Sequence, residues 1–508
     1  MIARKSAFII ASHLLSGIIG FVGLKFVALY MEPWEYGVVG FAYGFVSLFS
    51  FFRDIGFNSA HIKRVSEGKN LATCIGTFAA IKTVLTGILA SSVFIFIAIW
   101  KYVIGRGFES PLHEQVVYLM LAYYVLNSLT QIIISTFNAK KEIAKSEIPL
   151  FFYNLIRISA TIVVAYNGMG VLALAYTYVL GEIFYFTLSY LFFRKYPVGK
   201  PSKDYIKNYI SFAFPMAIAS ISSLIMSNID KVTIQLFWSS QQVGEYWAVY
   251  NLSQFLILFS QAVGTLLFPT ISEHFTKNNM AAIRDITLKA ERYLSMIIFP
   301  IIILMVVLAY PIIIILLSAK YEPALPVLQI VPFFILFVVM LDPYEKQLAG
   351  MNMPQLVRNR IVIMMIINVI LNLLLVPKDI QSIGLYNLPG LGATGAAIGT
   401  VVSYFVALIY TRYTAFKIAK IKGTRSIILH CIAAVVMGVI IYYLTDYMRY
   451  ITITRWYHLV LVSLFGFAIY YGILYFLREF KKEDYNFFLD TINIKKMLSY
   501  IRSEIRKK

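Results

Sequence analysis

The chain is poor in charged residues and almost lacks cysteine. Only 14% of its 508 residues are Asp, Glu, Lys or Arg, whereas soluble domains carry about 25%. Its two cysteines, Cys74 and Cys431, cannot form a disulfide framework, and no Cys/His spacing typical of a metal site occurs. Hydrophobic residues make up 59% of the chain. These features argue against a soluble enzyme or a metal module and indicate a protein for which the bilayer is the main solvent.

Two other classes are excluded by missing patterns. No GxxxxGK[ST] motif is present, so we expect no nucleotide hydrolysis by the chain itself. The net charge of +20 would suit nucleic acid, but the basic residues form short clusters between apolar runs. That placement is typical of cytoplasmic loops in membrane proteins, so we expect no nucleic-acid partner. The sequence also predicts no metal and no cofactor.

Apolar segments long enough to cross a bilayer recur along the whole chain. Each is close to the length of about 20 residues that a spanning helix requires. We therefore expect an all-α polytopic membrane protein with about fourteen transmembrane helices. The expected spans are 6–30, 36–52, 73–100, 114–137, 148–167, 170–193, 209–238, 243–268, 291–318, 325–349, 356–376, 392–411, 427–447 and 456–477.

The basic clusters give an orientation. They fall in alternate connections, for example at residues 140–145, 194–207 and 417–425, and such clusters mark the cytoplasmic side. We therefore expect both termini in the cytoplasm and no cleaved signal. The tryptophans, among them Trp34 and Trp247, fall at the predicted outer ends of spans, where an amphipathic ring prefers the headgroup region.

An internal repeat divides the predicted helices. A shift of 210 residues places Glu35-Tyr36 on Glu245-Tyr246, and seven of sixteen positions are identical between residues 35–50 and 245–260. This predicts two six-helix lobes of the same orientation around a central cavity. The predicted parts are an N-lobe of residues 1–200, a C-lobe of residues 201–420, two further helices in 421–478, and a basic amphipathic tail in 479–508 on the inner leaflet. The alternative for the tail is a partly disordered basic segment that only fixes the orientation.

Four short patches resemble a known family, in the same order along the chain. They are Met-Glu-Pro-Trp-Glu-Tyr-Gly at 31–37 with Arg-Asp-Ile-Gly at 53–56, Val-Gly-Glu-Tyr at 243–246 with Phe-Pro at 268–269, Ala-Lys-Tyr at 319–321 with Pro-Ala at 323–324, and Asn372 with the glycine-rich stretch 390–397. Together they resemble the polysaccharide-transport (Wzx-like) branch of the MOP flippase superfamily, which is related to the multidrug MATE transporters and the lipid II flippase.

The resemblance implies a function. It implies a flippase that moves polyprenyl-linked oligosaccharide across the cytoplasmic membrane by alternating access. The implied partners are this cargo, membrane lipids and the machinery that assembles the glycan.

Charged residues inside predicted spans are the first site candidates. A charge at the centre of a span costs about 2.5–3.5 kcal/mol on insertion scales, so such residues face a partner, a wet cavity or the interface. The excess is positive, and it suits a diphosphate or an acidic sugar. Lys25 and Lys82 could instead reach a membrane surface, and Glu182 could be an ion-pair partner of Arg157. The charged candidates are Lys25, Lys82, Arg157, Lys231, Asp230 and Glu182.

Uncharged polar residues and small residues complete the candidates. Amides in the spans could bind sugar hydroxyls, although most such residues in helix bundles join neighbouring helices. The amide candidates are Asn127, Gln131, Asn154, Asn251 and Gln254. Gly17, Gly20 and Pro215 lie in the two helices that bend during transport in the resembled family, so they are hinge candidates, although close helix packing is the alternative for the glycines.

Two other functions stay open. The alternative is a cation-coupled, MATE-like multidrug exporter, which requires acidic residues inside the bundle. A membrane enzyme such as a glycan polymerase is disfavoured, because the predicted outer connections are short and poor in catalytic residue types. We therefore expect no enzyme. The sequence does not decide between Na⁺ coupling, H⁺ coupling and the membrane potential.

Overall fold

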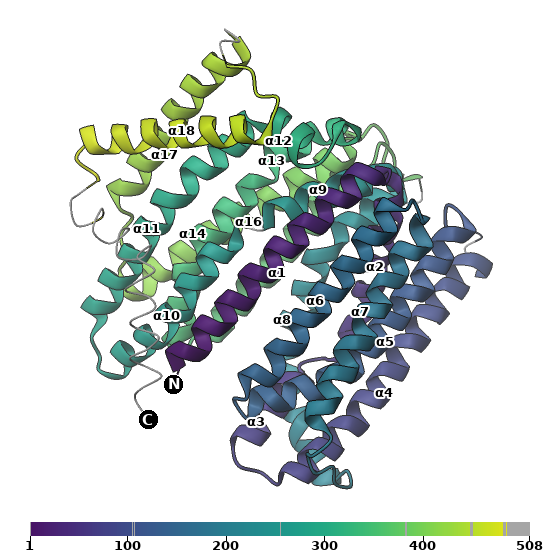
Figure 1. The fold of residues 1–508 in the computed structure, drawn as a ribbon. Helices are drawn as coiled ribbons and strands as arrows, with labels where there is room; N and C mark the ends of the chain where they lie inside the picture. The colour runs from purple at the N-terminus through teal and green to yellow at the C-terminus, as the bar shows by residue number, and fades with distance from the viewer. Residues whose placement is uncertain are drawn as a thin grey trace. The chain divides into compact units, whose positions relative to one another are not determined.

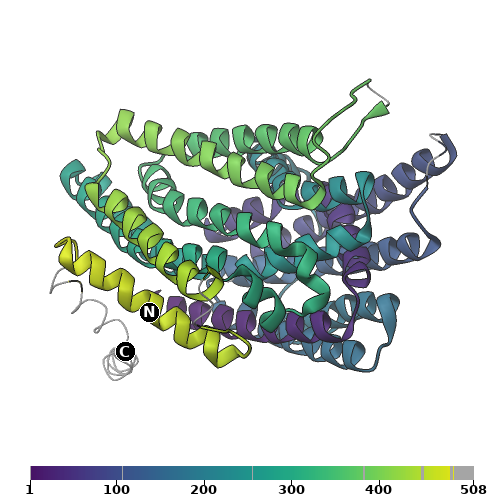
Figure 2. The same ribbon diagram turned by 90° about the horizontal axis from the view of Figure 1, so that it is seen from above.

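The computed structural model describes residues 2–103, 105, 107–254, 256–381, 384–447, 451–480 and 484. Within these residues every regular element is a helix, apart from one isolated antiparallel bridge between Ile380 and Leu385. The prediction of an all-α protein is therefore confirmed. The bridge closes the extended connection after residue 376, which Figure 2 shows projecting beyond the helix ends.

Most helices follow one another through short connections, and the connection between Leu375 and Gly392 is a longer one (Figure 1). The first seven are α1 (Ile2–Tyr30), α2 (Pro33–Phe49), α3 (Phe57–Ser66), α4 (Leu71–Ala98), α5 (Pro111–Ala139), α6 (Ile143–Tyr166) and α7 (Gly170–Phe193). The next seven are α8 (Lys203–Phe237), α9 (Ser240–Gln254), α10 (Ile257–Thr276), α11 (Met280–Val307), α12 (Ala309–Leu316), α13 (Leu325–Ile330) and α14 (Pro332–Gly350). The last four are α15 (Pro354–Leu375), α16 (Gly392–Ala419), α17 (Arg425–Tyr442) and α18 (Trp456–Phe476). Short 3₁₀ segments lie at Ser50–Arg53 and Ala319–Ala324, and a π segment at Ile99–Val103.

Eleven of the described helices are long and apolar enough to cross a membrane, and the bent α8 makes a possible twelfth. This confirms a multi-pass membrane protein. The predicted spans 6–30 and 243–268 fall on α1 and on α9 with α10, which include residues whose side chains are not described. The number fourteen therefore stays a prediction.

The motif at residues 31–37 explains where α2 begins. Pro33 occupies the first turn, where its missing N–H costs nothing. Glu32 caps the helix, and its own backbone N–H donates to the Glu35 side chain at 2.8 Å. Such a capping box satisfies donors that the first turn leaves free. The motif thus fixes the chain direction between α1 and α2.

The chain forms two compact units. Unit 1 contains residues 1–11, 249–360 and 400–508, and unit 2 contains residues 12–248 and 361–399. Helices α1, α9, α15 and α16 each pass from one unit to the other. These units follow contacts in this structure, and their bounds differ from those of the predicted lobes. The lobes stay a prediction.

Unit 2 holds the first helices of the chain. Helices α4, α5, α7 and α6 follow one another side by side (Figure 1). Helix α2 packs on α4, α5 and α7, and α3 packs on α4 and α5. Helix α8 joins this unit, with its parts Lys203–Ala213 and Ala217–Phe237 inclined by 58°. Pro215, a hinge candidate, falls in the break between these parts. A proline removes a helical hydrogen bond and is a common cause of such a bend.

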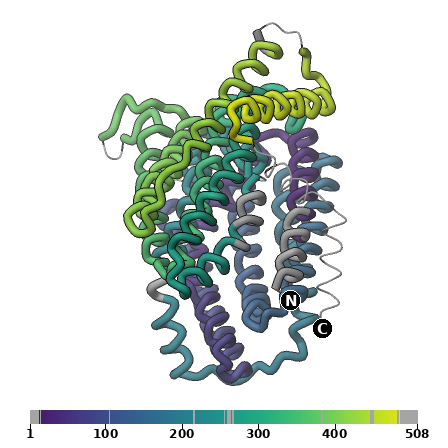
Figure 3. The backbone as a smooth tube through the Cα atoms, turned by 90° about the vertical axis from the view of Figure 1, so that its left-hand side faces the viewer, coloured from purple at the N-terminus to yellow at the C-terminus, as the bar shows by residue number. Residues whose placement is uncertain are grey.

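Unit 1 is organised around α11. Helices α10, α14 and α17 pack against it, and α18 packs on α17 (Figure 3). A Cβ at Gly438 of α17 would lie 2.4 Å from the Ile303 side chain, and one at Gly466 of α18 would lie 2.9 Å from Leu304. Glycine at these two positions lets the predicted extra helices approach α11 closely.

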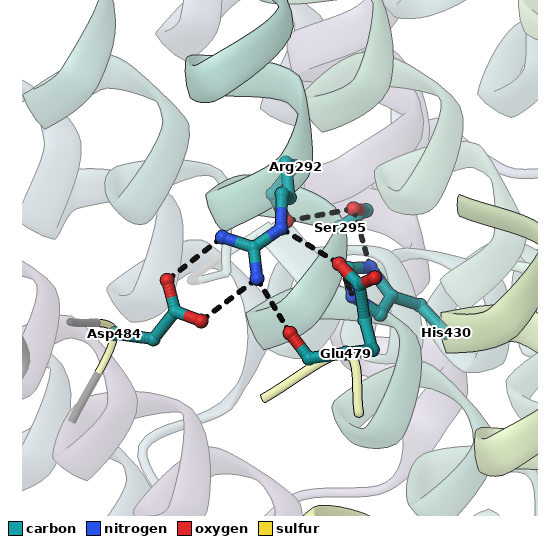
Figure 4. A network of polar contacts seen from close by, with 5 residues as sticks. All are labelled: Arg292, Ser295, His430, Glu479 and Asp484. Carbon is teal, nitrogen blue, oxygen red and sulfur yellow. Dashed lines mark hydrogen bonds and ion pairs between the residues drawn. The ribbon is translucent and has the colours of Figure 1, made fainter. Parts of the chain in front are cut away.

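An arginine on α11 fixes the start of the C-terminal tail (Figure 4). Arg292 donates two hydrogen bonds of 2.7 Å to the Asp484 carboxylate and one of 2.7 Å to the Glu479 side chain. His430, buried on α17, contacts Ser295 through Nδ1 at 2.8 Å and lies 3.7 Å from Glu479. Such forked contacts are both strong and directional. The rest of the predicted amphipathic tail lies outside the described residues.

This clamp gives a stability prediction. We expect Arg292→Ala to destabilise unit 1 by about 2–4 kcal/mol, less than for a fully buried pair, because the Arg292 side chain keeps 18% exposure. The two carboxylates would be left without their cation. The measurements are the apparent melting temperature and trypsin cleavage near residue 481. Lys289→Ala, which removes an exposed ion pair of the same helix, is the control. Unchanged cleavage in R292A would contradict the role of the clamp.

Candidate functional site

Arg157 enters unit 2 from α6 and has tyrosine rings as neighbours. The centre of its guanidinium lies 4.8 Å from the ring centroid of Tyr178 and 5.7 Å from that of Tyr153. Its Nε is buried without a hydrogen-bond partner. No described Asp or Glu oxygen lies within ion-pair distance of Arg157. Gly181 makes room for it, since a Cβ there would lie 2.9 Å from the Arg157 Cβ.

Lys231 on α8 has a similar environment. Its Nζ donates to the Asn228 side-chain oxygen at 2.9 Å and lies 5.4 Å from the Tyr43 centroid and 5.8 Å from the Trp247 centroid. It is 5% exposed, and no carboxylate of a described residue is within ion-pair distance. Gly44 of α2 makes room for the Lys231 side chain, because a Cβ at this glycine would lie 3.1 Å from it.

Tyr43 lies between the aromatic rings that contact the two cations. Its ring centroid lies 6.1 Å from that of Tyr178, which covers Arg157, and 6.1 Å from that of Trp247, which lies beside Lys231. Cation–π contacts of this kind contribute about 0.5–2 kcal/mol each and leave the hydrogen-bonding positions of the cation available to an anion. We call Arg157, Lys231, Tyr43, Tyr178 and Trp247 the cation–aromatic cluster. All five belong to unit 2.

Asp230 faces other partners than its neighbour Lys231. Tyr246 donates to Asp230 at 2.6 Å, and Asn372 of α15 donates to it at 2.8 Å. Adjacent residues on a helix point about 100° apart, so the two were expected not to pair with each other. Asp230 therefore ties α8 to α9 and α15, while Lys231 belongs to the cluster.

Glu182 does not pair with Arg157, contrary to one prediction. The carboxylate is fully buried on α7 and accepts hydrogen bonds from Asn127 at 3.2 Å and Thr130 at 2.7 Å, both on α5. Arg157 belongs to the neighbouring helix α6, but its side chain extends toward Tyr178. Two helices that are consecutive in the sequence can each have any rotation about their own axes, and this rotation decides which side chains meet. The predicted ion pair between Glu182 and Arg157 was therefore wrong.

Lys82 already has partners within the protein and is not available to bind an anionic cargo. It is 1% exposed, donates to the Arg53 carbonyl at 2.9 Å and lies 3.9 Å from the Asp54 carboxylate. It therefore does not reach a membrane surface, which was one predicted possibility. Arg53 is a site residue that the sequence reasoning missed. Its guanidinium donates to the Asn127 side-chain oxygen and lies 5.1 Å from the Tyr124 centroid. The Arg-Asp-Ile-Gly patch was the only signal for it.

The remaining candidates lie apart from these contacts. Asn154 donates to Ser16 of α1 at 3.3 Å and to the Leu150 carbonyl, which fits a role in helix packing. The half-buried Lys25 and Gln131 belong to unit 2, whereas Asn251 and Gln254 belong to unit 1. Gly17 and Gly20 are half-buried on α1, and a Cβ at Gly20 would meet nothing within 4 Å. Their hinge role stays a prediction.

The two copies of the repeated Glu-Tyr motif meet at the start of α2 and α9. A Cβ at Gly37 would lie 1.7 Å from the Ser240 carbonyl oxygen, and one at Gly244 would lie 1.8 Å from the Pro33 carbonyl oxygen. Only glycine allows two backbones to approach this closely. Trp247 is 7% exposed and stacks on Tyr36 with centroids 4.4 Å apart, so the prediction that Trp247 faces the headgroups was wrong.

A polar latch lies beside this glycine contact. Gln235, near the end of α8, donates to the Glu109 carboxylate at 2.6 Å, and Ser240 donates to it at 3.2 Å. His113 of α5 contacts the Ser240 hydroxyl at 2.7 Å and lies 3.4 Å from Glu109. The latch joins α5 to the turn between α8 and α9. The predicted orientation places this turn at the outer surface.

Metal ligands are not grouped in the described part of the chain. No three His, Cys, Asp or Glu side chains there are close enough to hold a metal ion. The features that unit 2 does bring together are two cations without carboxylate partners, a ring of aromatic side chains, and a separate network around Glu182. Such an arrangement can bind an anion and a ring-shaped polar group. It is therefore the candidate binding site of this multi-pass membrane protein.

Comparison with known proteins defines the family. The model of a family described as "Polysaccharide biosynthesis protein" matches residues 26–326. The chain belongs to this family. Over 443 residues it is 21% identical to the "Probable low-salt glycan biosynthesis flippase Agl15" of Haloferax volcanii, covering 87% of this chain and 89% of that protein.

Solved structures agree on the fold. The lipid II flippase MurJ in an inward closed conformation matches with a TM-score of 0.74 and 16% identity, over 92% of this chain and 98% of that one. An inward-facing multidrug MATE transporter of the MOP superfamily matches with a TM-score of 0.62 and 14% identity, over 80% and 96%. The predicted relationship to a polysaccharide family is confirmed by the family match, and the likeness to these two structures shows that the chain has their fold.

Proposed function

We propose that this protein is a flippase for polyprenyl-linked oligosaccharides in the cytoplasmic membrane, with both termini in the cytoplasm. The observation that carries the proposal is a pair of cations, the half-buried Arg157 and the buried Lys231, which have aromatic neighbours but no carboxylate within ion-pair distance among the described residues. Buried ionic groups without a partner are costly, so they are retained where a ligand supplies the opposite charge.

The chemistry of such a cargo suits the cluster. A diphosphate linker carries the anionic oxygens that lysine and arginine bind through charge-assisted hydrogen bonds. The apolar face of a sugar ring can pack on an aromatic ring such as that of the half-buried Tyr43, which lies beside Lys231. The family description and the flippase from Haloferax volcanii support a glycan precursor as cargo. The machinery that assembles the glycan is the expected partner on either side of the membrane.

Alternating access is the proposed mechanism. The glycine contact between α2 and α9 and the Glu109 latch would close the outer end of the path in this conformation. Bending of α8 at Pro215, with α1 yielding at Gly17 and Gly20, would open it. The binding residues would thereby face one side of the membrane at a time. No chemical step on the cargo is required, so we propose a transporter and not an enzyme.

A MATE-like exporter of organic cations is the second candidate. The buried Glu182 favours it, because such exporters use acidic residues in the bundle. Against it stand Arg157 and Lys231, which would repel a cationic drug at short range.

Reconstitution decides between the two candidates. Purified protein in liposomes should move a fluorescent polyprenyl-diphosphate disaccharide from one leaflet to the other, measured by protection from a membrane-impermeant quencher. It should not accumulate ethidium under the same gradients. Ethidium transport without movement of the lipid-linked sugar would overturn the proposed function.

A further inference from the structure

We propose that Glu182 is a proton-binding site, and that its protonation strengthens the binding of an anion at the cation–aromatic cluster. The inference rests on the proposed function, since it assumes that the cluster binds an anionic cargo. The observations behind it are the burial of Glu182, the kind of group that surrounds its two oxygens, and the connection from these oxygens to Arg53. None of these belongs to the cluster itself.

The carboxylate of Glu182 is enclosed by neutral donors. Thr130 donates to Oε1 and Asn127 donates to Oε2, while no Lys or Arg of the described residues lies within ion-pair distance. Two neutral hydrogen bonds stabilise a buried charge less than a salt bridge does. A carboxylate in such a place can exchange its charge for a proton at modest cost. Ionisable groups inside membrane bundles serve as proton sites for this reason.

The proton fits this place better than a metal ion. A sodium or divalent ion needs several oxygen ligands, but the Asn127 side-chain oxygen already accepts a hydrogen bond from Arg53. The positive charge of Arg53 is therefore held one amide away from Glu182, where it opposes a metal cation. A proton needs only one carboxylate oxygen. Protonation adds one O–H bond to Glu182, uses one proton from water and is reversed in the same way.

Asn127 connects the protonation state of Glu182 to the Arg53 guanidinium. When Glu182 is ionised, the amide of Asn127 lies between the carboxylate and the Arg53 guanidinium, so that the charges partly neutralise each other. When Glu182 is neutral, this compensation ends and the positive charge around the cluster increases. Arg53 lies over Tyr124, whose ring centroid is 5.6 Å from that of Tyr43 in the cluster.

The other charged and titratable groups near Glu182 do not change their charge over the same pH range. Facing it are Arg53 through Asn127, Tyr123 of α5, Tyr153 of α6 and Tyr185 of α7. The α6 cation, Arg157, lies over Tyr153. Arginine keeps its charge and tyrosine stays neutral over the physiological range. Among these groups, Glu182 is therefore the one whose charge changes there. By linkage, an anion that binds better to the protonated form must also increase proton affinity by the same factor.

The experiment uses the full-length protein in lipid nanodiscs with farnesyl diphosphate as the probe. We expect Glu182→Gln to bind the probe about tenfold more tightly than the wild type at pH 8, a typical size for coupling between two sites, and equally at low pH. Because the same probe is used for both proteins, its own titration cancels in the ratio of dissociation constants. Calorimetry in two buffers should also detect more proton uptake on binding by the wild type than by E182Q, because the proton exchange of the probe itself is common to both proteins.

Matched variants separate coupling from misfolding. Glu182→Asp should keep the pH dependence, and Asn127→Leu should weaken it although the carboxylate remains. Glu114→Gln removes an outer carboxylate that pairs with Lys101 and should behave as the wild type does. An identical pH profile in wild type and E182Q would overturn the inference while leaving the flippase proposal intact. Failure of the wild type to bind farnesyl diphosphate at any pH would instead count against the proposed function.

Discussion

Replacing Lys231 or Arg157 by Gln is expected to reduce movement of the polyprenyl-diphosphate disaccharide by about 30-fold or more. Truncating one partner of a buried, hydrogen-bonded charge pair costs about 2–5 kcal/mol, which corresponds to factors of roughly 30 to several thousand. Neither cation has a carboxylate within ion-pair distance among the described residues. Their loss therefore weakens the binding of the cargo and does not break an internal ion pair. The measurement is the initial flipping rate in liposomes, with the amount of inserted protein determined in parallel.

Three further variants sharpen this test. Arg157→Lys keeps the charge but loses the planar fork, so an intermediate rate is expected. Lys69→Gln removes a cation from an exposed connection and should leave the rate unchanged. Lys82→Gln should lower stability more than transport, because Lys82 already has Arg53 and Asp54 as partners. Normal rates in both R157Q and K231Q would exclude the cluster as the cargo site.

Substitution of Gly244 should open the outer end of the path. A Cβ at this position would overlap the Pro33 carbonyl oxygen, which is backbone and cannot rotate away. We expect Gly244→Ala to slow transport by about tenfold and Gly244→Val to abolish it, because α2 and α9 could no longer come together. Conformational changes depend on such discrete packing, and small steric changes at the contact shift the populations strongly.

Thiol labelling measures the opening directly. Val39 is fully buried on α2, two residues beyond Gly37. In a Cys431→Ser background, a cysteine at position 39 should react with a membrane-impermeant maleimide from outside faster when Gly244 is substituted than when it is not. Gly87→Ala is the matched control, since a Cβ at Gly87 meets nothing within 4 Å. If G244V flips the cargo normally, the contact is not part of the transport cycle.

The fold class was predictable because the membrane constrains it. Apolar length and basic clusters indicated a multi-pass helical protein, and eleven described helices meet that expectation. The repeat at Glu35-Tyr36 and Glu245-Tyr246 marked segments that the structure brings into contact. The reason for this contact is visible only in the structure, where Gly37 and Gly244 let the backbones of α2 and α9 approach each other.

The candidate site could be predicted in residue type, but the neighbours of its residues could not. The cost of charge inside a span directed attention to Arg157, Lys231 and Glu182, and the structure places all three in unit 2. Their neighbours depend on helix rotation, which a sequence without clear periodicity does not fix. Tyr43 and Tyr178 were missed for this reason, since aromatic residues are common throughout the chain. Arg53 was missed because it follows the apolar stretch and was assigned to a connection.

Helix α8 places two consecutive side chains on different neighbours. Asp230 holds α15 through Asn372, and Lys231 lies against α2 beside Tyr43. A roll of α8 about its own axis would therefore loosen one attachment while it alters the other. The part of α8 from Ala217 to Phe237 would in this way couple the presence of an anion near α2 to the position of α15, which has no contact with that anion.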